Sequence, residues 1–161
     1  MFILVRAITY SALFMGIVLV FLPARLLSFA GIARPEVLEA RHIIGAIITV
    51  GGVALVLWCV LTFAIVGKGT AAPFDPPRRL VVRGPYTVVR NPIYIGAGLA
   101  LVGASLFYGS LALLGYTAVF FLVSHLFVIL YEEPTLRRTF GTEYEEYCRE
   151  VGRWLPRTGK G

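Results

Sequence analysis

Two short stretches of this chain combine residue types that bind small polar ligands. The first, residues 83–96 (RGPYTVVRNPIYIG), holds two arginines, two tyrosines and two prolines at the start of an apolar segment. The second, Glu132-Glu133-Pro134, lies where a later apolar segment ends. Tyrosine rings offer an aromatic face to a cation, arginines pair with carboxylates, and carboxylates accept hydrogen bonds from ammonium or hydroxyl groups. We therefore predict that both stretches close on one small polar ligand.

Pro134 places the two glutamates at a kink, because a proline within a helix clashes with the carbonyl four residues earlier and removes a hydrogen bond. Adjacent carboxylates at the end of a membrane span are unfavourable unless they are solvated or partnered, and such charges commonly mark functional sites. The alternative is that Glu132 and Glu133 face water and pair with Arg137 and Arg138 one turn later. Taken with the first stretch, the pattern favours ligand binding.

The elements that must position these residues are membrane helices. Of the 161 residues, 58% are hydrophobic, and the mean hydropathy of +0.80 is well above that of a soluble domain. A helix needs about 20 apolar residues to cross a bilayer, and four windows come close: about 3–22, 43–66, 93–108 and 110–131. We predict an all-α fold, a single integral membrane four-helix bundle whose short third helix stops below one surface or shares that depth with the following turn.

Two further segments complete the expected architecture. Residues 67–91 are rich in Gly, Pro and Arg, which predicts a structured cytoplasmic loop. After Pro134, apolar residues recur every three or four positions, which predicts a C-terminal amphipathic helix broken near Gly141 that lies on the membrane face or caps the bundle. These residues are Leu136, Phe140, Tyr144, Tyr147, Val151 and Leu155. Small residues at Gly96, Ala100 and Ala104 predict a closely packed neighbouring helix.

The net charge of +6 is explained by membrane topology rather than by nucleic-acid binding. Lysines and arginines concentrate in residues 67–92 and after the fourth span, so we expect these segments and the N-terminus to face the cytoplasm. A cleaved signal peptide is disfavoured, because Arg6 lies inside a long apolar run. Cys59 and Cys148 lie far apart along the predicted topology without Cys or His at metal-ligand spacing, so we expect no disulfide and no structural metal.

The motifs of residues 67–157 resemble those of the isoprenylcysteine carboxyl methyltransferase family and its relatives, the phospholipid N-methyltransferases. The resemblance rests on LVVRGPY at 80–86, VRNPIYIG at 89–96, EEPTL at 132–136, and the later Phe140-Gly141, Tyr144, Tyr147, Val151, Arg153-Trp154 and Pro156. Members are integral membrane enzymes that use S-adenosylmethionine (SAM). The resemblance implies a SAM-dependent methyltransferase that acts on a lipophilic or prenylated small-molecule or lipid acceptor.

The resemblance also implies a set of cofactor-binding residues. Glutamate suits the ammonium or ribose hydroxyls of SAM, tyrosines suit its aromatic and cationic parts, and arginines suit its carboxylate. The set comprises Arg78, Arg79, Leu80, Val81, Tyr86, Arg90, Asn91, Pro92, Ile93, Tyr94 and Glu132.

Two departures from the family pattern concern the acceptor. Many relatives carry His at the position of Asn91, so no imidazole is present there, although Asn still forms hydrogen bonds. Carboxyl methyltransferases carry at the position of Val128 an arginine that orients the substrate carboxylate. An amine, thiol or other lipid-borne nucleophile therefore fits at least as well as a prenylcysteine carboxylate.

His125 is a candidate catalytic general base, because it precedes Glu132 by seven residues, two helical turns along one face. The alternative is a structural histidine bonded to a neighbouring helix. For the whole chain, two other functions remain open: a membrane reductase that uses NADPH, since sterol reductases are similar in their C-terminal architecture, and a non-catalytic lipid-binding bundle. A βαβ dinucleotide fold is not expected, since Gly96-Ala97-Gly98 lies on a helix.

Overall fold

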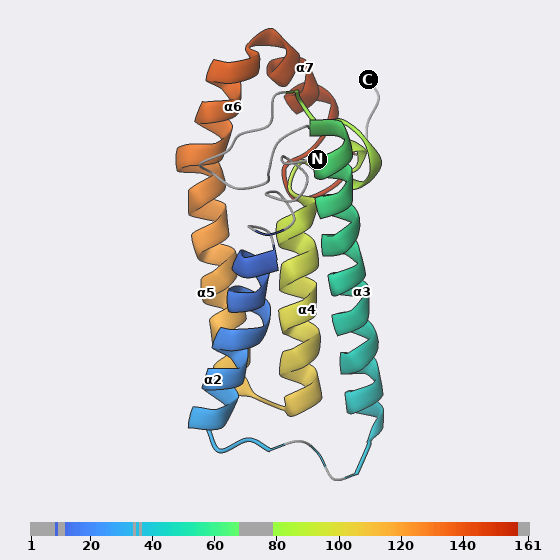
Figure 1. The fold of residues 1–161 in the computed structure, drawn as a ribbon, viewed down its shortest axis with the longest axis vertical. Helices are drawn as coiled ribbons and strands as arrows, with labels where there is room; N and C mark the ends of the chain where they lie inside the picture. Colours follow the sequence, from blue (N-terminus) through green and yellow to red (C-terminus); the bar gives the residue numbers. More distant parts are fainter. Residues whose placement is uncertain (1–8, 10–11, 34, 36, 68–78, 158–161) are drawn as a thin grey trace.

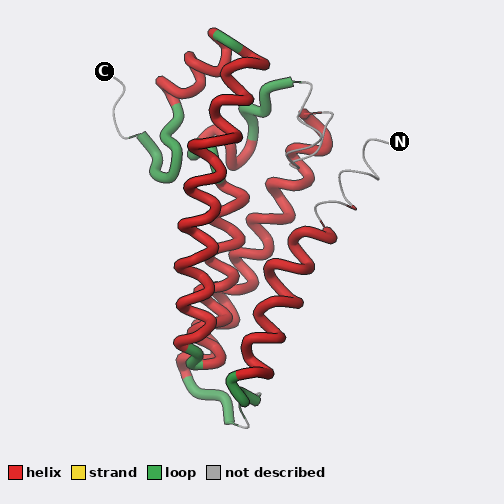
Figure 2. The backbone as a smooth tube through the Cα atoms, turned by 90° about the vertical axis from the view of Figure 1, so that its left-hand side faces the viewer, coloured by secondary structure: helices red, strands yellow, loops and turns green. Residues whose placement is uncertain are grey.

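The structure is a computed structural model that describes residues 9, 12–33, 35, 37–67 and 79–157. In this part of the chain the regular elements are helices, accompanied by one isolated parallel bridge between Val89 and Gly152. Long helices run side by side along the molecule, and the C-terminal helices form one end (Figures 1 and 2). The all-α prediction is confirmed for the described residues.

Within the described residues, three helices are long and apolar enough to cross a bilayer, namely Ala12–Phe29, Ala40–Val66 and Leu111–Phe140. The first contains η1 (Ile17–Phe21) and α2 (Leu22–Phe29), the second α3 (Ala40–Thr62) and most of η2 (Phe63–Gly67), and the third α5 (Leu111–Phe127), η4 (Val128–Glu132) and α6 (Glu133–Phe140). The remaining elements are η3 (Gly84–Thr87), α4 (Pro92–Tyr108) and α7 (Thr142–Glu150). At 17 residues, α4 is the short apolar helix that the sequence predicts.

Two prolines lie inside long helices, each just after a π-helical segment. The amide of Leu22 donates to the Ile17 carbonyl, and the amide of Glu133 donates to the Val128 carbonyl. This wider turn accommodates the ring of the following proline, Pro23 or Pro134, so the helix continues. The prediction that the first span ends near residue 22 is therefore wrong: its helix runs on to Phe29, and the predicted start at residue 3 lies outside the described residues.

Glycines bring the backbones of α3 and α4 into direct contact. A Cβ atom added at Gly52 would lie 2.4 Å from the Ala100 nitrogen and 2.5 Å from the Gly96 oxygen, distances that no side chain tolerates. One added at Gly103 would lie 2.5 Å from the Thr49 nitrogen. The expected close neighbour of Gly96 and Ala100 is thus confirmed, and it is α3.

A tight turn and one aromatic contact hold α5 against α4. Gly109 adopts a left-handed conformation with φ of 60°, and the Ser110 side chain accepts a hydrogen bond of 3.2 Å from the Leu113 amide, which caps α5. The Phe121 ring covers Gly98, where an added Cβ would lie 2.0 Å from the ring. These contacts set the position of α5, and hence of the two glutamates in the segments that continue it.

The C-terminal segment folds back over the residues before α4. Gly141, with φ of 52°, separates α6 from α7, at the predicted break. Tyr144, Tyr147 and Val151 form a buried cluster against which Leu80 packs. The helix ends at Glu150, so the prediction that Leu155 shares its apolar face is wrong: Leu155 is 76% exposed in an irregular segment.

Candidate active site

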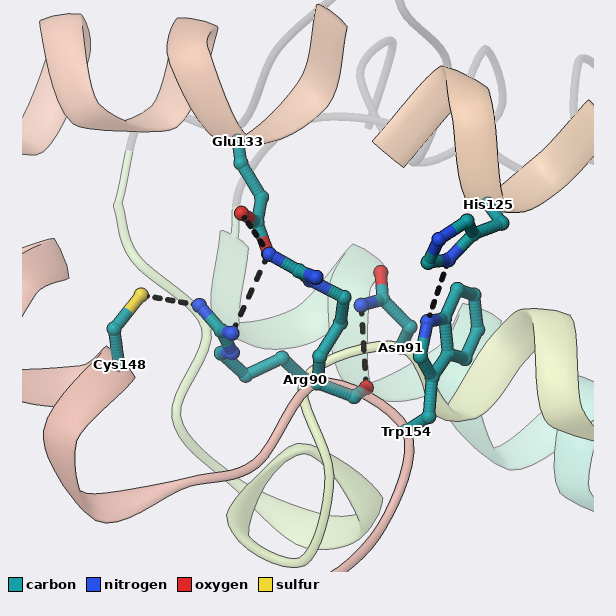
Figure 3. A network of polar contacts seen from close by, with 7 residues as sticks. Arg90, Asn91, His125, Glu133, Cys148 and Trp154 are labelled. Carbon is teal, nitrogen blue, oxygen red and sulfur yellow. Dashed lines mark hydrogen bonds and ion pairs between the residues drawn. The ribbon is translucent and has the colours of Figure 1, made fainter. Parts of the chain in front are cut away.

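A buried cluster of charges connects three distant segments at one end of the molecule. Glu133 begins α6, and its two carboxylate oxygens accept hydrogen bonds of 2.7 and 2.8 Å from Nε and Nη2 of Arg153. Nη2 of Arg90 lies 3.4 Å from the same carboxylate, and its Nη1 donates to the Cys148 sulfur (Figure 3). The side chains of Glu133 and Arg90 are 8% and 10% exposed. Buried charges are tolerated only with such partners.

This cluster aligns the residues that precede or follow its members in sequence. Asn91, next to Arg90, donates through Nδ2 to the Arg153 carbonyl at 3.3 Å. Glu132, next to Glu133, accepts a hydrogen bond of 3.2 Å from the Tyr94 hydroxyl. Residues 90–94 and the two glutamates within the third long helix therefore meet, as the sequence predicts.

Hydrogen bonds to backbone carbonyls stabilise the same junction. The amide of Arg90 donates to the Gly152 carbonyl at 2.8 Å, and the Tyr147 hydroxyl donates to the Tyr86 carbonyl at 2.7 Å. The hydrogen bonds from Arg153 to Glu133 also raise the pKa of the Arg153 guanidinium, so this cation stays charged. Helix α7 and the segment after it are thus attached to residues 86–91 at several points.

Tyr86 presents a buried hydroxyl without a hydrogen-bond partner. The residue is only 4% exposed, and its ring packs in a core cluster with Val81 and Ile93. The buried Cys59 thiol lies beside its hydroxyl, but no described group meets hydrogen-bond geometry with it. Burial raises the pKa of this phenol, which therefore keeps its proton and remains a donor. Unpaired buried polar groups are rare and costly, so such a group calls for a ligand or a water molecule.

The other predicted cofactor residues comprise buried side chains and three arginines. The side chains of Val81, Asn91, Pro92 and Ile93 are buried, so apart from the polar Asn91 these residues would reach a ligand mainly through backbone atoms. Arg79 is exposed and available, whereas the Arg90 guanidinium is already paired with Glu133. Arg78 lies outside the described residues.

His125 accepts, through Nδ1, a hydrogen bond of 3.0 Å from the indole Nε1 of Trp154. The expected shared face with Glu132 is altered, because the π-helical segment uses more residues per turn than an α-helix. The two residues are connected instead through Trp154 and Tyr94, whose rings lie 6.3 Å apart. Val128 is fully buried and offers no charge. A general-base role for His125 stays a prediction.

Sequence reasoning missed the partners that build this site. The alternative in which Glu133 faces water is wrong, because Glu133 is buried against Arg153 and Arg90. Arg153 and Trp154 appear in the motif that carries the family resemblance, but the sequence alone indicates no role for either. The sequence raises Cys148 only as a possible disulfide partner or metal ligand. In the structure it forms no disulfide, and its sulfur accepts a hydrogen bond from Arg90. The signal in the sequence for the segment after α7 is that Arg153 and Trp154 stand together at the end of the apolar pattern that follows Pro134.

One family model spans most of the elements that form this site. Residues 40–143, well over half of the chain, match the family model described as phospholipid methyltransferase. The chain belongs to the phospholipid methyltransferase family. The match covers α3 to the start of α7, and therefore Arg90 to Tyr94 together with both glutamates.

Two curated relatives of this family member are named for metal resistance. This chain is 31% identical over 115 residues to the nickel-cobalt-cadmium resistance protein NccN of Alcaligenes xylosoxydans xylosoxydans. The aligned residues make up 70% of this chain and 51% of NccN. The chain is 31% identical over 100 residues to the cobalt-zinc-cadmium resistance protein CzcN of Cupriavidus metallidurans, with coverages of 60% and 46%. The chain spans about half the length of these relatives. No solved structure matches it significantly. Among the described residues, no three His, Cys, Asp or Glu side chains gather as a metal site.

Proposed function

We propose that this chain is a membrane-embedded methyltransferase that uses SAM and methylates a lipid or another lipophilic acceptor. The observation that carries the proposal is the junction of Tyr94 with Glu132, held in place by the buried cluster of Arg90, Glu133 and Arg153. The match to the phospholipid methyltransferase family supports the reaction class.

The residues at this junction fit the chemistry of SAM. Among the described residues, Tyr94 is the one side chain that donates a hydrogen bond to Glu132, so this carboxylate can accept further bonds from an ammonium or hydroxyl group. Among the described residues, the Tyr86 hydroxyl has only the weakly bonding Cys59 thiol beside it, and Asn91 keeps its amide oxygen as an acceptor. Arg79 and Arg83 are exposed cations at the edge of the same loop. Together these groups would hold a nucleoside that carries an amino-acid end, with backbone contacts from Leu80 to Val81 and from Pro92 to Ile93.

SAM, when bound, supplies a methyl group on a positively charged sulfur, which a nucleophile takes by direct displacement. The contribution of the chain is alignment and exclusion of water. Glu132 and Asn91 are held in place by their neighbours Glu133 and Arg90, so they need little reorganisation to accept hydrogen bonds. Tyr94 and Trp154 also supply aromatic rings, whose faces attract a cation.

We also propose a four-helix membrane bundle whose cofactor end faces the cytoplasm. Supporting this, α4 lies between α3 and α5, and arginines gather at the end formed by α6 and α7. The acceptor would then enter from the bilayer and the cofactor from the cytoplasm.

Calorimetry on the purified protein in phosphatidylcholine nanodiscs tests the proposal. We expect binding of S-adenosylhomocysteine and none of NADPH. Glu132→Gln should weaken S-adenosylhomocysteine binding at least tenfold, whereas Glu146→Gln, an exposed glutamate on α7, should leave it unchanged. Binding of NADPH alone would favour a reductase, and binding of neither nucleotide would favour a non-catalytic bundle.

A further inference from the structure

The contact between Trp154 and His125 lies beyond the predicted cofactor residues. Trp154 belongs to the irregular segment after α7, and His125 belongs to α5, within a long apolar helix. Besides the hydrogen bond of 3.0 Å, their rings lie 6.0 Å apart (Figure 3). Because Arg153 is fixed by Glu133, the neighbouring Trp154 has a defined position from which to act on His125.

The hydrogen bond determines which nitrogen of His125 carries a proton. An indole N–H only donates, so Nδ1 of His125 must supply a lone pair. In a neutral imidazole the proton then resides on Nε2, and a protonated imidazole has no acceptor nitrogen at all. The contact therefore selects the neutral form with an Nε2–H group. In this form neither nitrogen has a free lone pair with which to take a proton from a nucleophile.

The Nε2 atom remains available for a ligand. No described group of the protein bonds it, since Trp154 is the one hydrogen-bond partner of the His125 side chain in the described part of the chain. His125 is half-buried, and its neighbours Leu122 and Leu126 are 59% and 47% exposed on an apolar surface. A lipid-soluble molecule in the bilayer can reach such a surface. His125 thus lies between the lipid-facing side of α5 and the Tyr94–Glu132 junction.

We propose that Trp154 is a positioning residue that holds His125 as a neutral hydrogen-bond donor for the acceptor. In this arrangement Nε2–H of His125 receives an oxygen of the acceptor's polar head, such as a carbonyl, carboxylate or phosphate oxygen. His125 then orients the acceptor and does not act as its base. This inference rests on the proposed methyltransferase function, and it adds a requirement for the acceptor: an oxygen near the methylated atom.

The tautomer can be measured without knowledge of the acceptor. The protein, labelled with ¹⁵N-histidine and reconstituted in phosphatidylcholine vesicles at pH 8, is studied by solid-state NMR. The chain has two histidines, so the signals lost in His125→Gln belong to His125. We expect the Nε2–H tautomer in the wild type and a mixture of tautomers in Trp154→Phe. A wild type with the proton on Nδ1, or a tautomer unchanged in Trp154→Phe, would overturn the proposal.

A second experiment separates a donor from a base. Membranes from cells that express each variant are incubated with methyl-labelled SAM, and label in their lipid extract is compared with that of membranes lacking the protein. Glutamine places an amide N–H near the position of Nε2 but takes up no proton, whereas asparagine places its amide near Nδ1. We expect His125→Gln to transfer at least about ten times more label than His125→Asn.

Each outcome of the transfer experiment decides between explanations. Equal loss in both variants, with S-adenosylhomocysteine affinity unchanged, would overturn the donor role in favour of a base. Tyr108→Phe, at the opposite end of α4, should match the wild type and controls for expression. If the wild type yields no labelled lipid, the result would contradict both the proposed function and the donor role. Calorimetry and the NMR tautomer would then show whether cofactor binding and the Trp154 contact survive.

Discussion

Tyr94 donates a hydrogen bond of 3.2 Å to Glu132, although 38 positions separate the two residues in sequence. Tyr94 lies in the first turn of α4, and Glu132 ends the π-helical segment that follows α5. The bond therefore joins the two stretches that the sequence marks as ligand-binding. Its geometry depends on the turn at Gly109 at the far end of both helices, which makes α4 and α5 antiparallel neighbours.

Removing this bond should affect ligand binding more than stability. Tyr94→Phe keeps the ring and its contact with Trp154 but deprives Glu132 of its donor. We expect a loss of about 1 kcal/mol in unfolding free energy and a three- to tenfold weaker affinity for S-adenosylhomocysteine. Calorimetry and thermal unfolding measure the two effects. Tyr108→Phe, on the same helix, should change neither, and equal behaviour of both variants would contradict a role for Tyr94.

Neutralising Glu133 should be much more damaging than neutralising an exposed glutamate. Glu133→Gln leaves the buried Arg90 without a counter-charge and weakens two hydrogen bonds to Arg153. We expect a loss of about 3 kcal/mol in unfolding free energy. Glu146→Gln on α7 should fall within about 0.5 kcal/mol of the wild type. Similar melting temperatures for the two variants in detergent would show that the charge cluster does not hold the segments together.

Two adjacent glycines of α3 should respond oppositely to the same substitution. Gly52→Ala drives a methyl group into the backbone of α4, 2.4 Å from the Ala100 nitrogen, and should cost about 2 kcal/mol or more. At Gly51 an added Cβ meets nothing within 4 Å, so Gly51→Ala should be neutral or stabilise the helix by up to about 1 kcal/mol. Unfolding in mixed micelles compares the two, and equal stability would argue against tight packing of α3 on α4.

Stability should fall in alkaline solution. Burial raises the pKa of Tyr86, Tyr144 and Tyr147 above the ordinary tyrosine value of about 10. Above that pH the unfolded chain loses these protons before the folded protein does. The stabilisation is therefore complete below about pH 10 and decreases as the pH rises, by up to about 1.4 kcal/mol per pH unit for each group. Unfolding measured from pH 9 to 11 tests this, and Tyr147→Phe should show a shallower decline. A flat profile would contradict the burial of these phenols.

The helices could be predicted where the signal is local. The length of apolar runs defines α3, α4 and α5, and a small-residue pattern at Gly96 and Ala100 predicts the close approach of another helix. The break between α6 and α7 follows from a single glycine with positive φ. Each of these features depends on residues within a few turns of one another.

The charge cluster could not be predicted, because its members occupy positions 90, 133 and 153 without a common spacing. The local pattern offered Arg137 and Arg138 as partners of the glutamates, whereas the buried Glu133 forms its ion pairs with Arg90 and Arg153, and Arg137 adds only a charge at longer range. The continuation of the first helix past Pro23 was also hidden, since it depends on a π-turn that leaves no mark in hydropathy. The two candidate motifs were recognisable, but the residues that hold them together were not.

The glycine contacts between α3 and α4 also limit how the protein can deform. Two backbones in contact cannot separate without many simultaneous losses, so this pair should behave as one stiff body. By contrast, α5 rests on α4 through the Phe121 ring over Gly98, and a ring can rotate. Widening of the molecule to admit a bulky lipid is therefore expected to bow the middle of α5 away from the stiff pair, between its two attachments at the Gly109 turn and the Glu133 charge cluster.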